Sequence, residues 1–390
     1  MNLTNLASRL DHIEPFHVME LVKMAAVLEQ QGRNIIHMGI GEPDFTAPPA
    51  VVVAAAQAMT ERKLQYTPAT GIIALRDAIS AHYLQTYGLN VPSSRIVVTA
   101  GASAALLLAC AALVEIGSEV LMPDPSYPCN RHFVAAFDGV AKMIPSGPEQ
   151  RFQLSDAMVR EHWSAHTRGV LLASPSNPTG TSITHDELRK IVASVRERNG
   201  FTIVDEIYQG LSYDAEPFSA LSLGDDVVVI NSFSKYFNMT GWRLGWLVVP
   251  EAIVPQIEKL AQNLFICPSS IAQHAGVACF APESLAIYEE RKEEFRRRRD
   301  FIVPALRELG FKVPVTPDGA FYVYADCSAL TDDADRLTID LLNEAGVVLV
   351  PGLDFGPHTA HNYIRLSYAT SYENLQEAVA RMRQFFAARK

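Results

Sequence analysis

The stretch SFSKYFNMTGWRLGW, residues 232–246, continues from the apolar run DVVVINSF. A run this short and this rich in β-branched residues predicts a strand that is covered on both faces. The first charged side chain beyond the strand is Lys235, with Ser232 and Ser234 before it and Arg243 after it. Polar groups that follow a buried strand this closely indicate a ligand site, because open α/β sheets bind ligands at the carboxyl ends of their strands.

The composition is that of a globular protein. The 390 residues are 48% hydrophobic, and 43 acidic against 33 basic side chains give a net charge of −10. A chain longer than roughly 250 to 300 residues usually needs a second core, so we expect two domains. The acidic balance argues against nucleic acid as a partner. The densest basic run, residues 296–299, alternates with acids at helical spacing and predicts a solvated helix face.

The N-terminal residues and the cysteines favour a cytoplasmic protein. The first residues carry Arg9, Asp11 and Glu14 and lack the apolar core of a signal peptide. Five scattered cysteines without a CxxC pair predict reduced thiols. The uncharged run 96–114 is long enough for a membrane span, but IVVT, AGAS and AALLLACAALV are typical of a strand, a turn and a helix. We therefore expect no membrane partner.

Short apolar strands alternate with helical segments such as 185–199 in the middle of the chain. The predicted strands are 95–100, 119–124, 169–174, 201–206, 227–232 and 244–249. This alternation predicts an α/β fold with a mostly parallel, doubly wound sheet. From about residue 285 a long amphipathic helix, alternating strands and a last helix predict a smaller α+β domain. We expect a large domain at 46–284, a small one at 285–390, and a segment at 1–45 that joins the small domain and a dimer interface.

Five of the predicted strands deliver polar or aromatic groups to one edge of the sheet. In chain order these are Gly101-Ala102-Ser103, Tyr127, Asn177, Asp205 with Tyr208, and Ser232 and Ser234 with Lys235. Each group alone could be a turn, a helix cap or ordinary packing. One ligand explains all of them, because pyridoxal 5′-phosphate (PLP) has a phosphate, a flat ring, a hydroxyl, a basic ring nitrogen and an aldehyde. A helix N-terminus suits the phosphate, a carboxylate suits the ring nitrogen, and a lysine forms a Schiff base.

On these motifs the chain resembles the class I aminotransferases of the aspartate aminotransferase superfamily, which are fold-type I PLP enzymes. The likeness runs from GIGEPDF at 39–45 to YIRLSYA at 363–369, and the lysine motif, NPTG and DEIY carry it. The resemblance implies a seven-stranded-type doubly wound sheet and a homodimer with shared active sites. It also implies ping-pong transfer of an amino group from an L-amino acid to a 2-oxo acid such as 2-oxoglutarate or pyruvate.

The resemblance also implies roles for individual residues at the cofactor ring. Lys235 resembles the Schiff-base lysine, which moves the proton between Cα and the cofactor C4′. Asp205 resembles the partner of the pyridine nitrogen, and Asn177 and Tyr208 resemble the donors to the ring hydroxyl. Tyr127 resembles the aromatic residue that stacks on the ring.

Further implied roles concern the phosphate and the substrate. The residues that match the phosphate site are Gly101, Ala102, Ser103, Ser232, Ser234 and Arg243. Tyr66 resembles a tyrosine that reaches the phosphate of the neighbouring subunit's cofactor. Arg365 resembles the arginine that binds the substrate α-carboxylate through two hydrogen bonds, a geometry suited to guanidinium. Gly41 and Asn177 match further substrate contacts.

The motifs leave the reaction and the substrate open. Related enzymes eliminate sulfur groups, so a C–S β-lyase is the alternative, while the early start of the matching region leaves no room for the DNA-binding head of a regulator. Ser103 stands where related aspartate enzymes have a lysine, which puts aspartate in doubt. The expected pocket neighbours, Phe16, Ile40, Tyr66, Tyr127 and Tyr322, favour a neutral or aromatic amino acid.

Several histidines and one cysteine are weaker candidates. His162 and His166 stand four apart and predict one helix face without a third metal ligand, so no metal is expected. His358 and His361 lie near Arg365 in sequence and could edge the substrate pocket. Cys129 is expected to pack rather than to act as a nucleophile.

Overall fold

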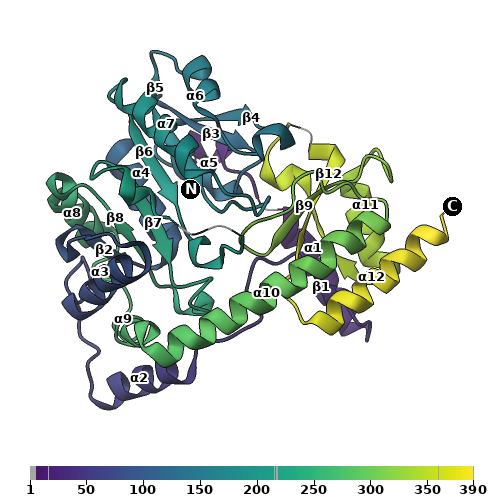
Figure 1. The fold of residues 1–390 in the computed structure, drawn as a ribbon, viewed down its shortest axis with the longest axis horizontal. Helices are drawn as coiled ribbons and strands as arrows, with labels where there is room; N and C mark the ends of the chain where they lie inside the picture. The colour runs from purple at the N-terminus through teal and green to yellow at the C-terminus, as the bar shows by residue number, and fades with distance from the viewer. Residues whose placement is uncertain (1–5, 16, 215, 217, 359, 390) are drawn as a thin grey trace, which may run out of the picture.

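The computed structural model describes residues 6–15, 17–214, 216, 218–358 and 360–389, and its centre is a seven-stranded sheet (Figure 1). In spatial order the strands are β2 (Ile96–Thr99), β8 (Gly245–Val248), β7 (Val228–Ser232), β6 (Phe201–Asp205), β5 (Thr167–Ala173), β3 (Glu119–Asp124) and β4 (Val140–Pro145). Neighbouring strands are parallel except around β8, which is antiparallel to both β2 and β7. The predicted mostly parallel sheet is thus confirmed.

The prediction missed the edge strand β4. Its end residues are exposed and most of the others are only half-buried, and they include Lys142, so the run lacks the continuous apolar character of a strand covered on both faces. The predicted start of the helix after β2 is also misplaced. The expected turn at 100–103 is wrong, because α4 (Gly101–Leu113) begins directly at the end of β2.

Helices cover both faces of the sheet, as a doubly wound fold requires. They are α2 (Pro49–Thr60), α3 (Ile73–Tyr87), α4, α5 (Pro128–Ala135), α6 (Asp156–His162), α7 (His185–Arg196), α8 (Val254–Leu264) and α9 (Ser270–Val277). Neighbouring residues of one strand point to opposite faces of the sheet and pack in different hydrophobic cores. Val97 and Ile203 pack with α4 and α8, whereas Val98 and Val204 pack in the larger core on the opposite face.

A second group of elements forms the smaller sheets. β11 (Val350–Pro351), β12 (Tyr363–Ser367) and β9 (Tyr322–Asp326) form an antiparallel sheet, and β1 (Ile36–His37) pairs in parallel with β10 (Val347–Val348). Around them lie α1 (His17–Gln30), α11 (Ala334–Asp340) and α12 (Tyr372–Ala387). α10 (Pro282–Glu308) runs without a break from α9 toward these strands (Figure 1). No helix in the described part of the chain has the length and apolar character needed to cross a membrane.

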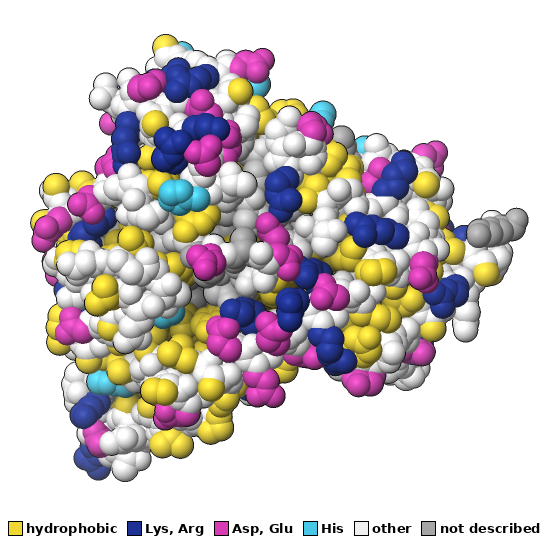
Figure 2. Space-filling view, in the orientation of Figure 1, with side chains coloured by type: hydrophobic (Ala, Val, Ile, Leu, Met, Phe, Trp, Pro, Cys, Tyr) yellow, Lys and Arg dark blue, Asp and Glu magenta, His cyan; other side chains and the backbone are white. Residues whose placement is uncertain are grey.

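The basic run on α10 is only half solvated. Figure 2 shows basic and acidic side chains interleaved over this helix, and Arg296 and Arg297 pair there with acids three residues before them. Arg298 is buried instead, and its guanidinium donates to both carboxylate oxygens of Asp44 at 2.8 and 3.0 Å. Arg299 is also buried and pairs with Asp214. The expectation of a solvated face is wrong for these two arginines, because distant carboxylates compensate their burial.

Candidate active site

A cavity of about 430 Å³ lies at the carboxyl edge of the large sheet, and side chains from the small antiparallel sheet complete its wall. The predicted site residues that line it are Gly41, Ala102, Ser103, Tyr127, Asn177, Asp205, Tyr208, Ser232, Ser234, Lys235, Arg243 and Arg365. Gly101 lies beside the lining, next to Arg243. Tyr66 is not among the lining residues, and its side chain is 81% exposed. The structure therefore brings together residues spread over most of the sequence.

Lys235 follows β7 and is half-buried with its amine in the cavity. Its Nζ donates to the carbonyl oxygen of Gly41 at 2.5 Å. Burial lowers the pKa of Lys235 to about 8, and Glu42 opposes this shift whereas Arg365 acts with it. A lysine with a lowered pKa carries more neutral amine at ordinary pH, which is the form that attacks a carbonyl group.

Asp205 is the last residue of β6, and 5% of it is exposed. One of its carboxylate oxygens accepts the backbone N–H of Ile207 at 3.0 Å. Burial raises the pKa of Asp205 to about 7, while this hydrogen bond and the charge of Lys235 oppose the shift. A buried carboxylate with so few donors is suited to pair with a cationic ligand group.

The N-terminus of α4 and the turn after β7 form a cradle for an anion. Gly101 has a φ of +81°, and a side-chain carbon there would lie 2.6 Å from Nη2 of Arg243. The cap residue Ala100 offers no side chain to the first helical N–H groups, which leaves them for a ligand. Nη1 of Arg243 donates to the carbonyl of Thr240 at 3.1 Å, and no carboxylate pairs with Arg243 in the described part of the chain. Ser232 and the α4 N-terminus face the same cavity.

Arg365 projects from β12 into the cavity opposite the sheet edge. It is buried, and its Nη1 donates to Oδ1 of Asn177 at 2.9 Å while Nη2 donates to the carbonyl of Gly39. The guanidinium lies 4.7 Å from the ring centre of Tyr322 and 4.8 Å from that of Phe355. Its Nε has no hydrogen-bond partner among the residues that the structure describes. A buried guanidinium held by two rings with a free donor is suited to bind a carboxylate.

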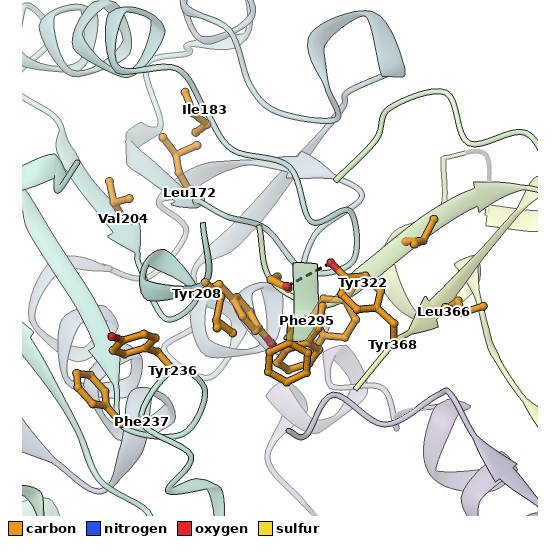
Figure 3. Close-up of a cluster of buried hydrophobic side chains, with 14 of the residues drawn as sticks. Leu172, Ile183, Val204, Tyr208, Tyr236, Phe237, Phe295, Tyr322, Leu366 and Tyr368 are labelled. Carbon is orange, nitrogen blue, oxygen red and sulfur yellow. Dashed lines mark hydrogen bonds between the residues drawn. The ribbon is translucent and has the colours of Figure 1, made fainter. Parts of the chain in front are cut away.

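Two tyrosines join the two parts of the wall. The hydroxyl groups of Tyr208 and Tyr322 lie 2.8 Å apart, and Figure 3 shows both residues in the buried cluster between the large sheet and β9. Sequence reasoning placed Tyr322 only among the pocket neighbours. Tyr322 lies opposite Gly41, and a Cβ at Gly41 would lie 2.2 Å from the Tyr322 hydroxyl. A contact between residues this far apart in the chain leaves no local pattern in the sequence.

Sequence reasoning missed the residues that place α1 over the cavity. Asp354 is 2% exposed, and its carboxylate oxygens accept the N–H groups of His17 at 2.7 Å and Val18 at 2.9 Å. This cap fixes the first turn of α1 against the cavity. Val18, Met19 and Val22 of α1 then line it. Phe355 and Ile40 complete this apolar wall; only Ile40 was predicted.

The weaker candidates lie elsewhere. His162 ends α6 whereas His166 precedes β5, so the expectation that they share one helix face is wrong. His358 and His361 are exposed and do not line the cavity. Within the described ranges no cluster of potential metal ligands occurs. Burial raises the pKa of Cys129, which is unlike an activated nucleophile. Phe16, an expected pocket neighbour, lies outside the described residues.

Comparisons with known proteins agree with this geometry. The family model for class I and II aminotransferases matches residues 33–382. A valine–pyruvate aminotransferase from Mycobacterium tuberculosis is 38% identical over 372 residues, which cover 95% of this chain and 96% of that protein. A (5-formylfuran-3-yl)methyl phosphate transaminase from Methanocaldococcus jannaschii is 35% identical over 383 residues, covering 97% of this chain and 99% of the other. The crystal structure of an aminotransferase from Mycobacterium tuberculosis superposes with a TM-score of 0.95 at 36% identity, covering 98% of this chain and 99% of that one.

Proposed function

The chain belongs to the class I and II aminotransferases and is a PLP-dependent transaminase, and from this premise we propose how its residues perform the reaction. The observation that carries the proposal is the position of the Lys235 amine in one cavity with Asp205, Arg243 and Arg365. When bound, PLP supplies an aldehyde that links covalently to amines and a ring that takes up electrons from Cα.

The cofactor residues act by position and charge. The α4 N-terminus from Gly101 to Ser103, with Ser232, Ser234 and Arg243, holds the phosphate. Asp205 holds a proton on the ring nitrogen, and Asn177 and Tyr208 donate to the ring hydroxyl. Tyr127 stacks on the ring. This assignment is supported by the cradle at Gly101, which a Cβ would fill, and by the buried carboxylate of Asp205, which accepts the N–H of Ile207 as its one donor among the described residues.

Lys235 serves as the base that moves the substrate proton. With PLP bound, the Lys235 amine would hold the cofactor in the resting enzyme, and in its neutral form it would accept the Cα proton of the substrate and later give it back. A lowered pKa keeps part of the amine neutral near neutral pH. Arg365 fixes the substrate α-carboxylate, with the backbone of Gly41 and the amide of Asn177 beside it, so that the Cα–H bond points toward Lys235.

We propose a neutral amino acid as donor, with an apolar or aromatic side chain. Of the described residues that line the cavity, the basic ones are Lys235, Arg243 and Arg365. Each already has a role toward the cofactor or the α-carboxylate, so none remains for a side-chain carboxylate. The wall formed by α1 is apolar, and Asp354 behind it is acidic. The acceptor is pyruvate or 2-oxoglutarate; the same charges favour pyruvate, in line with the name of the valine–pyruvate relative.

The proposal includes assembly and location. Tyr66 is exposed in one chain, which supports a homodimer in which it reaches the partner's cofactor. Five free cysteines support the cytoplasm as the compartment. We propose the domain limits 46–284 and 285–390, with 1–45 joining the small domain; α1 contacts β10 and β11, which supports the last point.

A half-reaction tests the proposal. Protein loaded with PLP is mixed with single L-amino acids and no oxo acid, and the absorbance spectrum is recorded. Conversion of the lysine-linked cofactor to pyridoxamine phosphate identifies the donor. Unchanged cofactor with release of ammonia or thiol would show a lyase instead. Lys235→Ala should slow turnover by a factor on the order of 10³ or more, whereas Lys190→Ala, an exposed control on α7, should not. Normal turnover in Lys235→Ala would refute the assignment.

A further inference from the structure

The exposed Tyr66 lies in a segment, residues 65–72, whose backbone is held by several hydrogen bonds to the rest of the protein. Residues 65–72 form the second part of the connection between α2, which ends at Thr60, and α3. Tyr66 within this segment is 81% exposed and does not line the cavity of its own chain. Large aromatic side chains on mobile loops lose conformational freedom when they dock. The backbone on both sides of Tyr66 is instead fixed to the body of the protein.

Gln273 provides the central fastening. This residue of α9 has no exposed surface, and its amide bridges the two ends of the segment. Its Oε1 accepts the N–H of Ile72 at 2.8 Å. Its Nε2 donates to Oγ1 of Thr67 at 2.9 Å and to the carbonyl of Pro268 at 3.1 Å. A buried amide that satisfies partners on both sides of a turn holds that turn in one conformation.

The surrounding contacts support the same conformation. Oγ of Ser270, also on α9, donates to the carbonyl of Gln65 at 2.7 Å. The N–H of Val98 in β2 donates to the carbonyl of Thr70 at 3.0 Å. Gly71 has a φ of +92°, and a side-chain carbon there would lie 2.6 Å from Cβ of Val98 and 3.1 Å from Oε1 of Gln273. The segment therefore fits only in close contact with β2 and Gln273.

We propose that Gln273 is a positioning residue for the active site of a second copy of this chain. It holds Thr67 and Ile72 so that Tyr66 is presented in an ordered position to the cofactor phosphate of the partner. The inference rests on the proposed homodimer with Tyr66 in a shared site. Because the backbone of the segment is ordered before docking, only the rotamer freedom of the Tyr66 side chain is lost when its hydroxyl reaches the phosphate.

A double-mutant cycle measures whether Gln273 acts through Tyr66. We expect Gln273→Leu to weaken PLP binding by the holoenzyme about tenfold, the cost of ordering one or two residues. In a Tyr66→Phe background the same change should weaken binding less than about twofold, because the contact it supports is already lost. Thr67→Val removes a single hydrogen bond and provides a milder variant, with an expected loss of about threefold.

The matched control is Gln153→Leu. Gln153 is also a buried glutamine, and its Nε2 donates to the carbonyls of Ala173 at 3.2 Å and Thr181 at 2.8 Å, away from the Tyr66 segment. Its effect on PLP binding should be the same with Tyr66 and with Phe at that position. Equal effects of Gln273→Leu or Thr67→Val in the two backgrounds would overturn the proposal.

Mixed dimers show in which subunit Gln273 acts. Differently tagged chains are co-purified so that one subunit carries Lys235→Ala and only the other subunit is catalytic. Gln273→Leu on the Lys235→Ala subunit should raise the PLP requirement of the single live site about tenfold, whereas Gln273→Leu on the live subunit should not. An effect only within the live subunit would overturn the positioning role while leaving transamination intact. Absence of any half-reaction in the unmodified protein would instead refute the proposed function.

Discussion

The amine of Lys235 should titrate near pH 8 in the protein freed of cofactor. Burial lowers its pKa from 10.5 to about 8, a difference worth about 3 kcal/mol in favour of the neutral form. At pH 7.5 about a quarter of the amine is then neutral, against about one part in a thousand for an ordinary lysine. This difference of more than two orders of magnitude is the largest chemical consequence of placing the lysine at the buried sheet edge.

The neighbouring charges predict how variants shift this titration. Glu42 raises the pKa and Arg365 lowers it, so Glu42→Gln should move the midpoint down and Arg365→Met should move it up. Glu42 is exposed, so its effect is screened by solvent and should amount to about half a pH unit, shrinking as salt is added. Arg365 is buried and should give a larger shift, about one unit.

The assay is competitive labelling of the cofactor-free protein with acetic anhydride over roughly pH 6 to 11, a range that spans both ordinary and lowered lysine pKa values. Mass spectrometry of the peptide that contains Lys235 gives its labelled fraction, and the same peptide in urea-unfolded protein gives the ordinary midpoint. A midpoint in the folded protein equal to that of the unfolded protein would refute the reasoning. So would a midpoint that rises in Glu42→Gln.

Two further predictions concern a hydroxyl group in the cavity wall and a buried carboxyl group at the end of β3. Tyr322→Phe removes the hydroxyl that lies 2.8 Å from that of Tyr208. Half-reaction rates should show kcat/KM lowered about fivefold, and thermal unfolding should show an unchanged Tm. An unchanged kcat/KM would show that the hydrogen bond between the two hydroxyls is dispensable. Asp124 is 2% exposed, and one of its oxygens has no hydrogen-bond partner among the described residues. Burial raises the pKa of Asp124 from 3.8 to about 6, so the folded state binds the extra proton and loses stability as the pH rises through that window. Asp124→Asn should therefore raise stability by up to about 3 kcal/mol at pH 8 and much less at pH 4, and a gain that does not grow with pH in denaturant unfolding would contradict this.

Lys235 and Asp205 could be predicted as site residues because each lies at the end of a strand that the sequence shows clearly. Lys235 and Asp205 each follow a short apolar run, and the parallel arrangement of β6 and β7 brings the ends of those runs to the same edge. A short apolar run followed by a short polar motif is thus enough to identify both residues in the sequence. The edge strand β4 shows the limit of this approach, because half-exposed strands lack the apolar continuity on which it depends.

Charged residues mark a second limit. Arg298 has the sequence surroundings of a surface arginine, and its burial is compensated by Glu294 one helical turn earlier and by Asp44, which lies 254 positions earlier. The Arg298–Asp44 ion pair also holds the segment that contains Gly41, whose carbonyl oxygen accepts a hydrogen bond from the Lys235 amine. A contact between positions so far apart leaves no periodic signal, so a sequence analysis assigns such a residue to solvent by default.

The same limit explains why the reaction could be predicted more fully than the substrate. The residues that we propose to act on the cofactor lie at the ends of the sheet strands, whereas the apolar wall comes from α1, whose Val18 N–H donates to Asp354 across 336 positions of sequence. Val18 and Val22 have the spacing of an ordinary amphipathic helix, and the pattern does not distinguish packing against a core from facing a ligand. In the proposed function, substrate choice therefore depends on where α1 is docked. That docking combines the buried contacts of Leu21 and Ala25 with the carboxylate of Asp354, whose role becomes visible only in three dimensions.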